Sequence, residues 1–416
     1  MNNNRKGYSL PTTVFLSLLM LMNTGFFLMA RNQGLRLVSG AIIAGVLVGI
    51  FAAMMYTGNI ARYRRIFFAM AAFLFFPSFI ATLIEHRGSM AICADTALKN
   101  ENPMCHITFT STAIPYLLKG VLVFPAKVSH YYAAFYAMLI MWIIATLSFG
   151  RGWCSWICFY GGWDDTFSRL AKKERITIDP KNDKVRYFSF AILIFVALAS
   201  LVTMSVVYCE WLCPFRTITE FSPVTDFTSM IMFIIMTFTF FGLLIIVPFL
   251  TRKRFQCMSF CPFGAMQSLI GKIGFYKVRI DTDKCTRCMK CVKVCPTMSI
   301  SEDCINEKRG KPLMTCTMCG ECITECPAKA IDYTFMGKRR CGTGFFNGLH
   351  SRFSARQGIV NTILAAVFKS FDEVLSPRAL FIFAAFTFGM IVSSGFSVST
   401  VERLMNLFIN GTFFVK

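Results

Sequence analysis

The sequence predicts an α-helical polytopic membrane protein that carries a small, cysteine-rich α+β domain toward its C-terminal end. Of its 416 residues, 55% are hydrophobic and 16% are charged. The mean hydropathy is +0.55, which is typical of membrane proteins. Apolar runs of about 20 residues, the length of a membrane-spanning helix, recur along the chain. Most of the 18 cysteines lie in tight groups, which favours metal ligation over disulfides in a chain of this kind.

Six apolar runs precede the cysteine-rich region, and a seventh follows it. We expect transmembrane helices at 11–30, 37–56, 66–83, 131–149, 187–208, 230–250 and 379–396. The first run lacks a small-residue cleavage site, so it is interpreted as a retained helix and not as a signal peptide. A last apolar segment, 401–414, is expected to lie at the outer membrane interface.

Lysine and arginine gather in alternate loops, and this bias predicts the orientation of the chain. The basic loops lie at 62–65, 169–186 and 252–254. We expect them to face the cytoplasm of a prokaryotic cell, with the cysteine-rich domain on the same side of the plasma membrane. Because topology explains the net charge of +21, we predict no nucleic-acid partner.

Two cysteine runs share the spacing C-x2-C-x2-C-x3-C-P. In this bacterial pattern three thiolates of one run bind a [4Fe-4S] cluster, and the fourth binds the other cluster. One predicted cluster therefore has the ligands Cys285, Cys288, Cys291 and Cys326, and the other has Cys316, Cys319, Cys322 and Cys295. Zinc also accepts four thiolates, but the doubled register favours iron and sulfur. This region resembles the bacterial two-cluster ferredoxins, which are one-electron carriers.

Three further cysteine pairs with C-x3-C spacing stand at predicted span ends: Cys154 and Cys158, Cys209 and Cys213, and Cys257 and Cys261. Residues four apart lie on one face of a helix, so each pair would aim two sulfurs at one point. The first and third pairs share the predicted cytoplasmic side, and we expect them to bind one iron-sulfur cluster jointly. Buried free thiols are the alternative. The nearby Trp153, Trp156, Trp163 and Trp211 are expected in an interfacial aromatic belt.

The pair Cys209 and Cys213 is predicted on the opposite side of the membrane, where Cys93 and Cys105 also occur. These four could hold an outer cluster. Alternatively, Cys93 and Cys105 form a disulfide or remain free thiols. Glu85, His86 and His130 lie near outer span ends, where they could serve a quinone or act as interfacial anchors.

Paired C-x3-C motifs followed by a two-cluster module resemble the NapH/NosR group of respiratory electron-transfer proteins, over roughly residues 130–335. The resemblance implies electron delivery between a quinol or a cytoplasmic donor and a redox enzyme. It also implies that Cys257 and Cys261 are cluster ligands. Cys158 departs from the group's pattern, because Phe159 follows it where proline is usual, which would allow the helix to continue there.

We expect a membrane domain at 1–275, a ferredoxin-like domain at 276–335, an amphipathic connector at 336–377, and a C-terminal transmembrane helix with an interfacial tail at 378–416. The leading hypothesis is a membrane subunit that carries electrons from a cytoplasmic donor to an outer-face acceptor, such as an external flavoprotein or reductase, within a redox complex. Two alternatives stay open: a quinone-linked subunit without an outer cluster, and an electron-transfer subunit of an ion-translocating complex. No catalytic residue is predicted.

Overall fold

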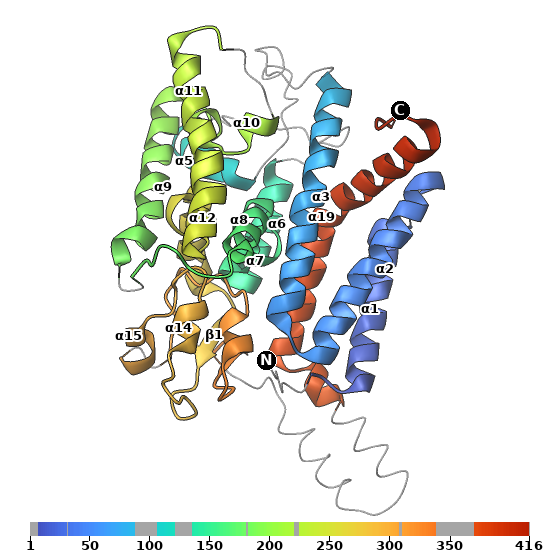
Figure 1. The fold of residues 1–416 in the computed structure, drawn as a ribbon, viewed down its shortest axis with the longest axis vertical. Coiled ribbons are helices and arrows are strands. Elements are labelled where there is room, and N and C mark those ends of the chain that lie inside the picture. Colours follow the sequence, from blue (N-terminus) through green and yellow to red (C-terminus); the bar gives the residue numbers. More distant parts are fainter. Residues whose placement is uncertain are drawn as a thin grey trace, which may run out of the picture.

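The computed structural model describes residues 7–30, 32–87, 106–120, 135–179, 182–219, 224–307, 310–337 and 370–415. Figure 1 shows a bundle of long helices with a small module of short helices and strands packed at one end. This module is the ferredoxin-like module of residues 276–335. Residues 338–369 of the predicted connector lie outside the described residues, as do Cys93, Cys105 and His130.

Six helical stretches in these ranges are long and apolar enough to span a membrane. They are α1 (Leu10–Leu28), α2 (Gly34–Thr57), α3 (Ile60–Arg87), α9 (Asp183–Thr203), the stretch Phe227–Thr251 and α19 (Pro377–Asn410). The fifth stretch joins α11 (Phe227–Phe238) to α12 (Val247–Thr251) through a π-helical segment. All six overlap predicted spans. The run expected at 131–149 is described only from its fifth residue, as α6 (Phe135–Phe149), so a seventh span stays a prediction.

The last helix differs from the expectation of a span followed by a separate surface segment. Helix α19 runs without a break from Pro377 to Asn410 and ends at Gly411, which has a positive φ of 70°. No proline or glycine interrupts its final turns after Gly395. The hydroxyls of Ser393 and Ser397 donate to carbonyls four residues earlier, a contact that bends helices. Figure 1 shows the final part of α19 leaning toward the C-terminus.

Short helices connect the long ones, and the π-helical segments Tyr208–Leu212 and Gln256–Phe260 carry Cys209 and Cys257. The short helices are α5 (Phe109–Lys119), α7 (Trp153–Trp156), α8 (Phe159–Leu170), α10 (Arg216–Thr219) and α13 (Pro262–Ile270). In the ferredoxin-like module, β1 (Tyr276–Ile280) pairs antiparallel with β2 (Ile331–Phe335). Helices α14 (Lys290–Val294), α15 (Glu302–Asn306) and α16 (Glu321–Glu325) complete the module. The predicted α+β character is confirmed.

The module is packed firmly against the helix bundle. Arg378, at the start of α19, donates two hydrogen bonds of 2.7 Å to the carboxylate of Asp332 on β2. The ring of Tyr333 stacks on Phe381 of α19 at 4.1 Å. Trp156 donates from its indole nitrogen to the Met318 carbonyl at 3.2 Å. Trp153 and Trp156 are only 2% and 1% exposed, so their expected place in an interfacial belt is wrong: they fill the core beside the module.

Candidate metal centres

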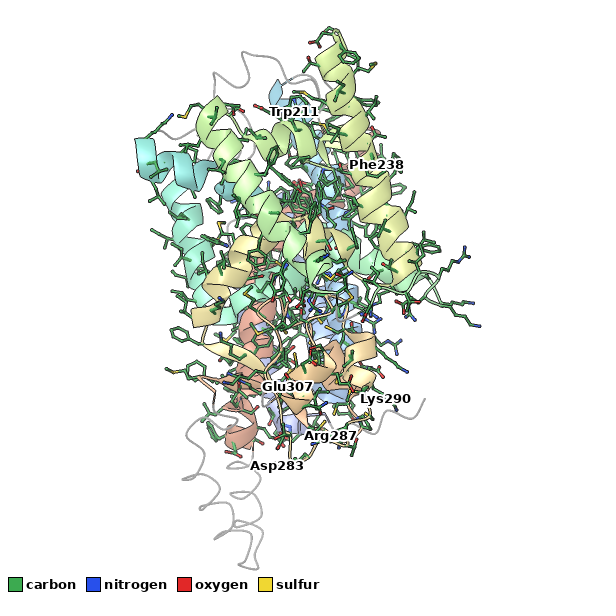
Figure 2. The ribbon with its side chains drawn as sticks, turned by 90° about the vertical axis from the view of Figure 1, so that its left-hand side faces the viewer. Trp211, Phe238, Asp283, Arg287, Lys290 and Glu307 are labelled. Atoms are coloured by element: carbon green, nitrogen blue, oxygen red, sulfur yellow. The ribbon has the colours of Figure 1, made fainter. Side chains whose placement is uncertain are left out.

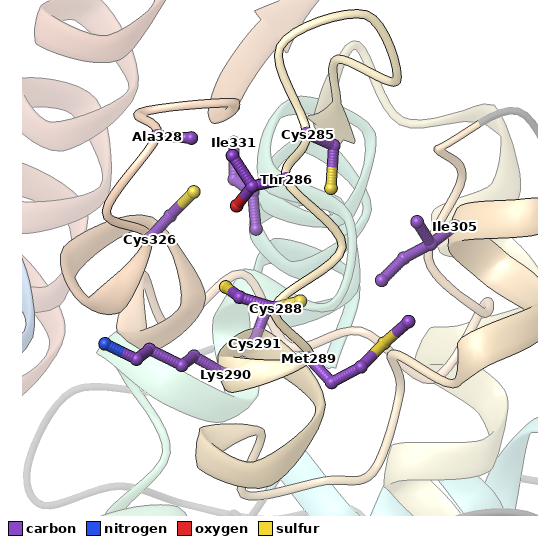
Figure 3. A pocket seen from close by; sticks show the side chains of 10 residues that line it. All are labelled: Cys285, Thr286, Cys288, Met289, Lys290, Cys291, Ile305, Cys326, Ala328 and Ile331. Carbon is purple, nitrogen blue, oxygen red and sulfur yellow. The ribbon is translucent and has the colours of Figure 1, made fainter.

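The first predicted set of four cysteines surrounds one cavity. Cys285, Cys288, Cys291 and Cys326 line it together with apolar side chains that include Ile305 and Ile331. Figure 3 shows the sulfurs of Cys285, Cys288, Cys291 and Cys326 grouped around this space. Cys288 is exposed, so this set lies at the protein surface. Four thiols around an apolar cavity fit a [4Fe-4S] cluster.

The second predicted set surrounds a separate cavity closer to the helix bundle. Its lining includes Cys295, Cys316, Cys319 and Cys322, with Val278 and Ile300 as apolar neighbours. Cys295, from the first run, thus joins the three cysteines of the second run, as the interlocked spacing predicts. Cys304 is fully buried and lines neither of the two cavities.

The grouping of the donors bears on the zinc alternative. Within the described ranges, no three histidine, cysteine, aspartate or glutamate side chains stand close enough to share a single metal ion. A mononuclear zinc site needs four ligand atoms within about 2.3 Å of one point. Cysteines spread around a cavity instead suit a polynuclear cluster, whose iron atoms extend toward each thiolate.

We expected each C-x3-C pair to lie on one continuous helix, but in the structure the helical backbone ends within each pair. In each pair the first cysteine belongs to a helical turn, while the second has extended backbone with ψ of 118° at Cys158, 112° at Cys213 and 113° at Cys261. The amide of Cys158 donates to the Trp153 carbonyl, and that of Cys261 to the Gln256 carbonyl, five residues earlier in both cases. Because Cys158 precedes α8 as its N-cap, the helix ends there despite the missing proline.

The first and third pairs form a symmetric arrangement, which we call the inner set (Cys154, Cys158, Cys257 and Cys261). Both pairs sit in the pattern Arg-x2-Cys-x3-Cys-x2-Gly, beginning at Arg151 and at Arg254. Arg151 donates to the Cys257 carbonyl at 2.7 Å, and Arg254 donates to the Cys154 carbonyl. Each arginine therefore holds the first cysteine of the opposite motif.

The last position of this pattern must be glycine, because the arginine of the opposite motif packs directly against it. A Cβ added to Gly161 would lie 2.5 Å from Nη2 of Arg254 and 2.3 Å from the Cys154 carbonyl oxygen. A Cβ on Gly264 would lie 2.6 Å from Nη2 of Arg151. Neither approach is tolerated between non-bonded atoms. The pair Cys209 and Cys213 has Val206 and Arg216 at the matching positions, so it lacks both the arginine and the glycine.

The thiols of the inner set are buried, and burial governs their ionisation. It raises the pKa of Cys261 to about 12 and holds the pKa of Cys257 well above its usual value. Without a metal both thiols would stay protonated near neutral pH. Metal binding is the event that converts such groups into thiolates, so these residues fit a cluster that compensates their burial.

The pair Cys209 and Cys213 was expected on the opposite side of the membrane from the inner set, but its contacts bring it close to that set. The Sγ of Cys213 is 3.0 Å from the hydroxyl of Tyr160, which stands two residues after Cys158. The hydroxyl of Tyr208 accepts a hydrogen bond of 3.3 Å from the Gln256 side chain. Figure 2 shows Trp211, between the two cysteines, toward the end of the bundle far from Arg287 and Lys290. The pair thus reaches from the far end of the bundle into its interior.

Of the residues considered for a quinone, Glu85 has a structural partner. Its carboxylate accepts hydrogen bonds from Arg403 of α19 and from the Val415 amide, which fits the interpretation as an anchor. The side chain of His86 lies outside the described residues, as does His130.

Sequence reasoning missed three residues at the inner set. Arg151 and Arg254 could have been found, because the repeated Arg-x2-Cys-x3-Cys-x2-Gly pattern is visible in the chain. His106 could not. Its Nε2 lies 3.1 Å from the Sγ of Cys158, although the two residues are 52 positions apart and no motif links them.

Comparison with known proteins gives two family matches. Residues 277–327 match a family described as 4Fe-4S dicluster domain. Residues 133–177, 185–222 and 233–280 each match a family described as 4Fe-4S binding domain. Each of these three segments contains one C-x3-C pair, so the pair at Cys209 and Cys213 is matched like the other two.

Among curated relatives, the ferredoxin-type protein NapH of Escherichia coli is 26% identical over 231 residues, which cover 55% of this chain and 71% of NapH. The YccM protein of the same organism, whose name refers to electron transport, is 24% identical over 173 residues, or 40% of this chain and 47% of YccM. An uncharacterized protein of Methanocaldococcus jannaschii is 25% identical over 163 residues, or 38% of this chain and 56% of that protein. The chain thus spans about half the length of the last two relatives. No solved structure matches it.

Proposed function

We propose that this chain, a membrane iron-sulfur electron-transfer protein of the NapH type, conducts electrons from a soluble donor at its ferredoxin-like module into the helix bundle. A [4Fe-4S] cluster, when bound, supplies reversible one-electron storage. Cys285, Cys288, Cys291 and Cys326 would hold the first cluster, and Cys295, Cys316, Cys319 and Cys322 the second. The inner set would hold a third.

The observation that carries this proposal is a direct hydrogen-bonded connection between the second cysteine set and the inner set. Arg151 donates from Nη1 to the Thr315 carbonyl at 3.0 Å and from Nη2 to the Cys257 carbonyl at 2.7 Å. Thr315 precedes Cys316, so one side chain joins the backbones of two ligands in different sets. On the other side of this connection, the Arg254 amide donates to the Pro296 carbonyl at 2.8 Å, beside Cys295.

Electrons would be accepted at the first set, because only a surface cluster can come close to a soluble carrier. Cys288 is exposed there, and the exposed Arg287 and Lys290 flank it. These cations favour a donor protein with an acidic surface. We place this face in the cytoplasm, since the basic loops of the bundle lie on the same side.

Electrons would leave through the pair Cys209 and Cys213, which lies beyond the inner set as seen from the module. Tyr160 spans the gap, since it follows Cys158 by two residues and its hydroxyl contacts the Cys213 sulfur. The acceptor would be a partner redox protein on the far face of the plasma membrane. In this arrangement the four cysteine sites form a series across the bundle.

Iron counting on anaerobically purified protein tests the third cluster. Cys154→Ser combined with Cys257→Ser is expected to lower the iron content by one cluster, about four iron atoms per chain, and to remove one EPR signal. Cys304→Ser is the matched control, because Cys304 is buried but lines neither ferredoxin cavity. Unchanged iron in the double variant would contradict the inner site.

Sealed vesicles test conduction across the membrane. With reductant on the module side, an impermeant acceptor on the other side is expected to be reduced, and the rate should fall sharply in Cys209→Ser/Cys213→Ser. Reduction that requires added quinone, with no effect of this variant, would favour the quinone-linked alternative.

A further inference from the structure

Two buried side chains place nitrogen atoms beside sulfurs of the inner set. Nε2 of His106 lies 3.1 Å from the Sγ of Cys158, and Nη2 of Arg254 donates to the Sγ of Cys257 at 3.4 Å. His106 comes from a helical segment outside both motifs, and Arg254 belongs to the same motif as Cys257. The two contacts reach one cysteine of each motif, so both halves of the inner set have a side-chain nitrogen beside a sulfur.

His106 is held in place by aromatic rings. Its ring lies 4.6 Å from that of Phe263 and 5.7 Å from that of Trp153, and the residue is 7% exposed. A cysteine that ligates iron has lost its proton and can only accept. Nε2 must therefore carry the hydrogen when Cys158 is a ligand, which defines the tautomer of the imidazole.

Two sulfurs of the ferredoxin-like module accept hydrogen bonds from backbone amides instead. The Ser299 amide donates to the Sγ of Cys295 at 3.2 Å, and the Ala330 amide donates to the Sγ of Cys326 at 3.4 Å. These are neutral backbone groups. Arg254 is charged, and a hydrogen bond from a charged donor is roughly twice as strong as a neutral one.

The presence of a charged donor affects the reduction potential expected for a cluster at the inner set. Reduction adds negative charge to a cluster, so donors to its sulfurs stabilise the reduced form and raise the potential. Burial works in the opposite direction by removing water from the added charge. At the inner set, burial also strengthens each direct electrostatic contact, because the local dielectric is low. The guanidinium of Arg254 therefore offsets the loss of water where the charge develops.

We infer that His106 and Arg254 are positioning residues that give the inner set the highest reduction potential of the three four-cysteine sites. Electrons then move downhill from the ferredoxin-like module into the bundle, which fixes the direction of flow. This inference rests on the proposed function, because it requires a cluster at the inner set.

A redox titration followed by EPR tests the inference on the full-length protein. The inner signal is identified as the one absent from Cys154→Ser/Cys257→Ser. In wild type its midpoint potential is expected to lie above those of both ferredoxin-like clusters. His106→Phe, which removes the donor but keeps a ring, is expected to lower the inner midpoint and to leave the other two unchanged. His106→Gln retains an N–H donor and is expected to recover part of the shift.

Three outcomes overturn the inference: an inner midpoint below those of the module, no shift in His106→Phe, or an equal shift of all signals. If His106→Phe does not retain the inner cluster, His106→Gln and Arg254→Lys take its place, and an unshifted inner midpoint in both overturns the inference. If the wild-type protein shows no third EPR signal, the proposed function itself is contradicted. If a third signal is present but its midpoint potential does not respond to the variants, only this inference is contradicted.

Discussion

Asp165 is a buried carboxylate that pairs with two buried arginines between the bundle and the module, one of which also pairs with Glu321. Its carboxylate lies 3.0 Å from Nη2 of Arg64 and 3.9 Å from Nε of Arg254. Burial alone raises the pKa of Asp165, but the guanidiniums of Arg64, Arg254 and Arg169 hold it at about 2. Because the folded pKa is below the ordinary value, the carboxylate stabilises the fold above about pH 4, and this contribution is lost only as the pH falls toward 2.

Replacing Asp165 with asparagine is expected to destabilise the protein by about 3–5 kcal/mol, because Arg254 would lose this carboxylate and Arg64 would keep only Glu321 as its buried partner. Thermal unfolding of detergent-solubilised protein measures the effect at neutral pH. Asp283→Asn, in an exposed loop of the module, is the control and should change stability by less than about 0.5 kcal/mol. Equal melting temperatures for the two variants would contradict the assigned role.

Gly161→Ala is expected to disturb the inner set, because the new methyl would collide with the Cys154 carbonyl and the Arg254 guanidinium. Overpacking of this kind costs about 1–3 kcal/mol, and the displaced arginine should reduce iron at this set while the ferredoxin-like clusters persist. Iron content and EPR report both. Gly395→Ala is the control, since a Cβ there meets no atom within 4 Å. Full iron content in Gly161→Ala would count against the symmetric arrangement.

At the scale of elements, one local structure recurs in the helix bundle and in the module. The last cysteines of the ferredoxin-like runs, Cys295 and Cys326, have ψ of 114° and 111° after a short helix. Cys158, Cys213 and Cys261 have nearly the same backbone. The spacing C-x3-C therefore specifies a helical turn followed by an extended cysteine, whether or not proline follows.

The loop around Cys288 is the element expected to receive the donor. Arg287→Glu/Lys290→Glu should slow reduction by an acidic soluble ferredoxin by about tenfold at low ionic strength, because steering by charge is reversed. The difference should shrink as salt screens the charges. Stopped-flow absorbance measures the rate, and Lys311→Glu, an exposed change elsewhere in the module, should have little effect. A rate independent of both salt and charge would exclude docking at this loop.

Across the whole molecule, the three four-cysteine sets are graded in exposure. The first set includes the exposed Cys288, the second lies against the bundle with half-buried Cys316, and all four cysteines of the inner set are buried. Buried arginines lie between these sets, and two of them, Arg64 and Arg254, come from the basic loops that indicate topology in the sequence. Arg64, Arg151 and Arg254 are each no more than 2% exposed.

Exposure predicts the order in which iron is lost. Under an iron chelator with air admitted, the cluster at Cys285, Cys288, Cys291 and Cys326 is expected to decay first and that of the inner set last, because oxidant and chelator must reach the sulfurs. Timed EPR spectra follow each signal, with the anaerobic sample as control. Simultaneous decay of all signals would show that unfolding, and not local access, controls the loss.

The sequence by itself predicted the class of protein, the six helices that are long and apolar enough to span a membrane, and which cysteines line each of the two ferredoxin-like cavities, because these depend on local runs and fixed spacings. Tertiary structure decided the rest. The exchange of Arg151 and Arg254, the approach of His106 to Cys158, and the contact of Tyr160 with Cys213 join residues from separate motifs. Packing of buried side chains sets such contacts, and no periodicity along the chain encodes them.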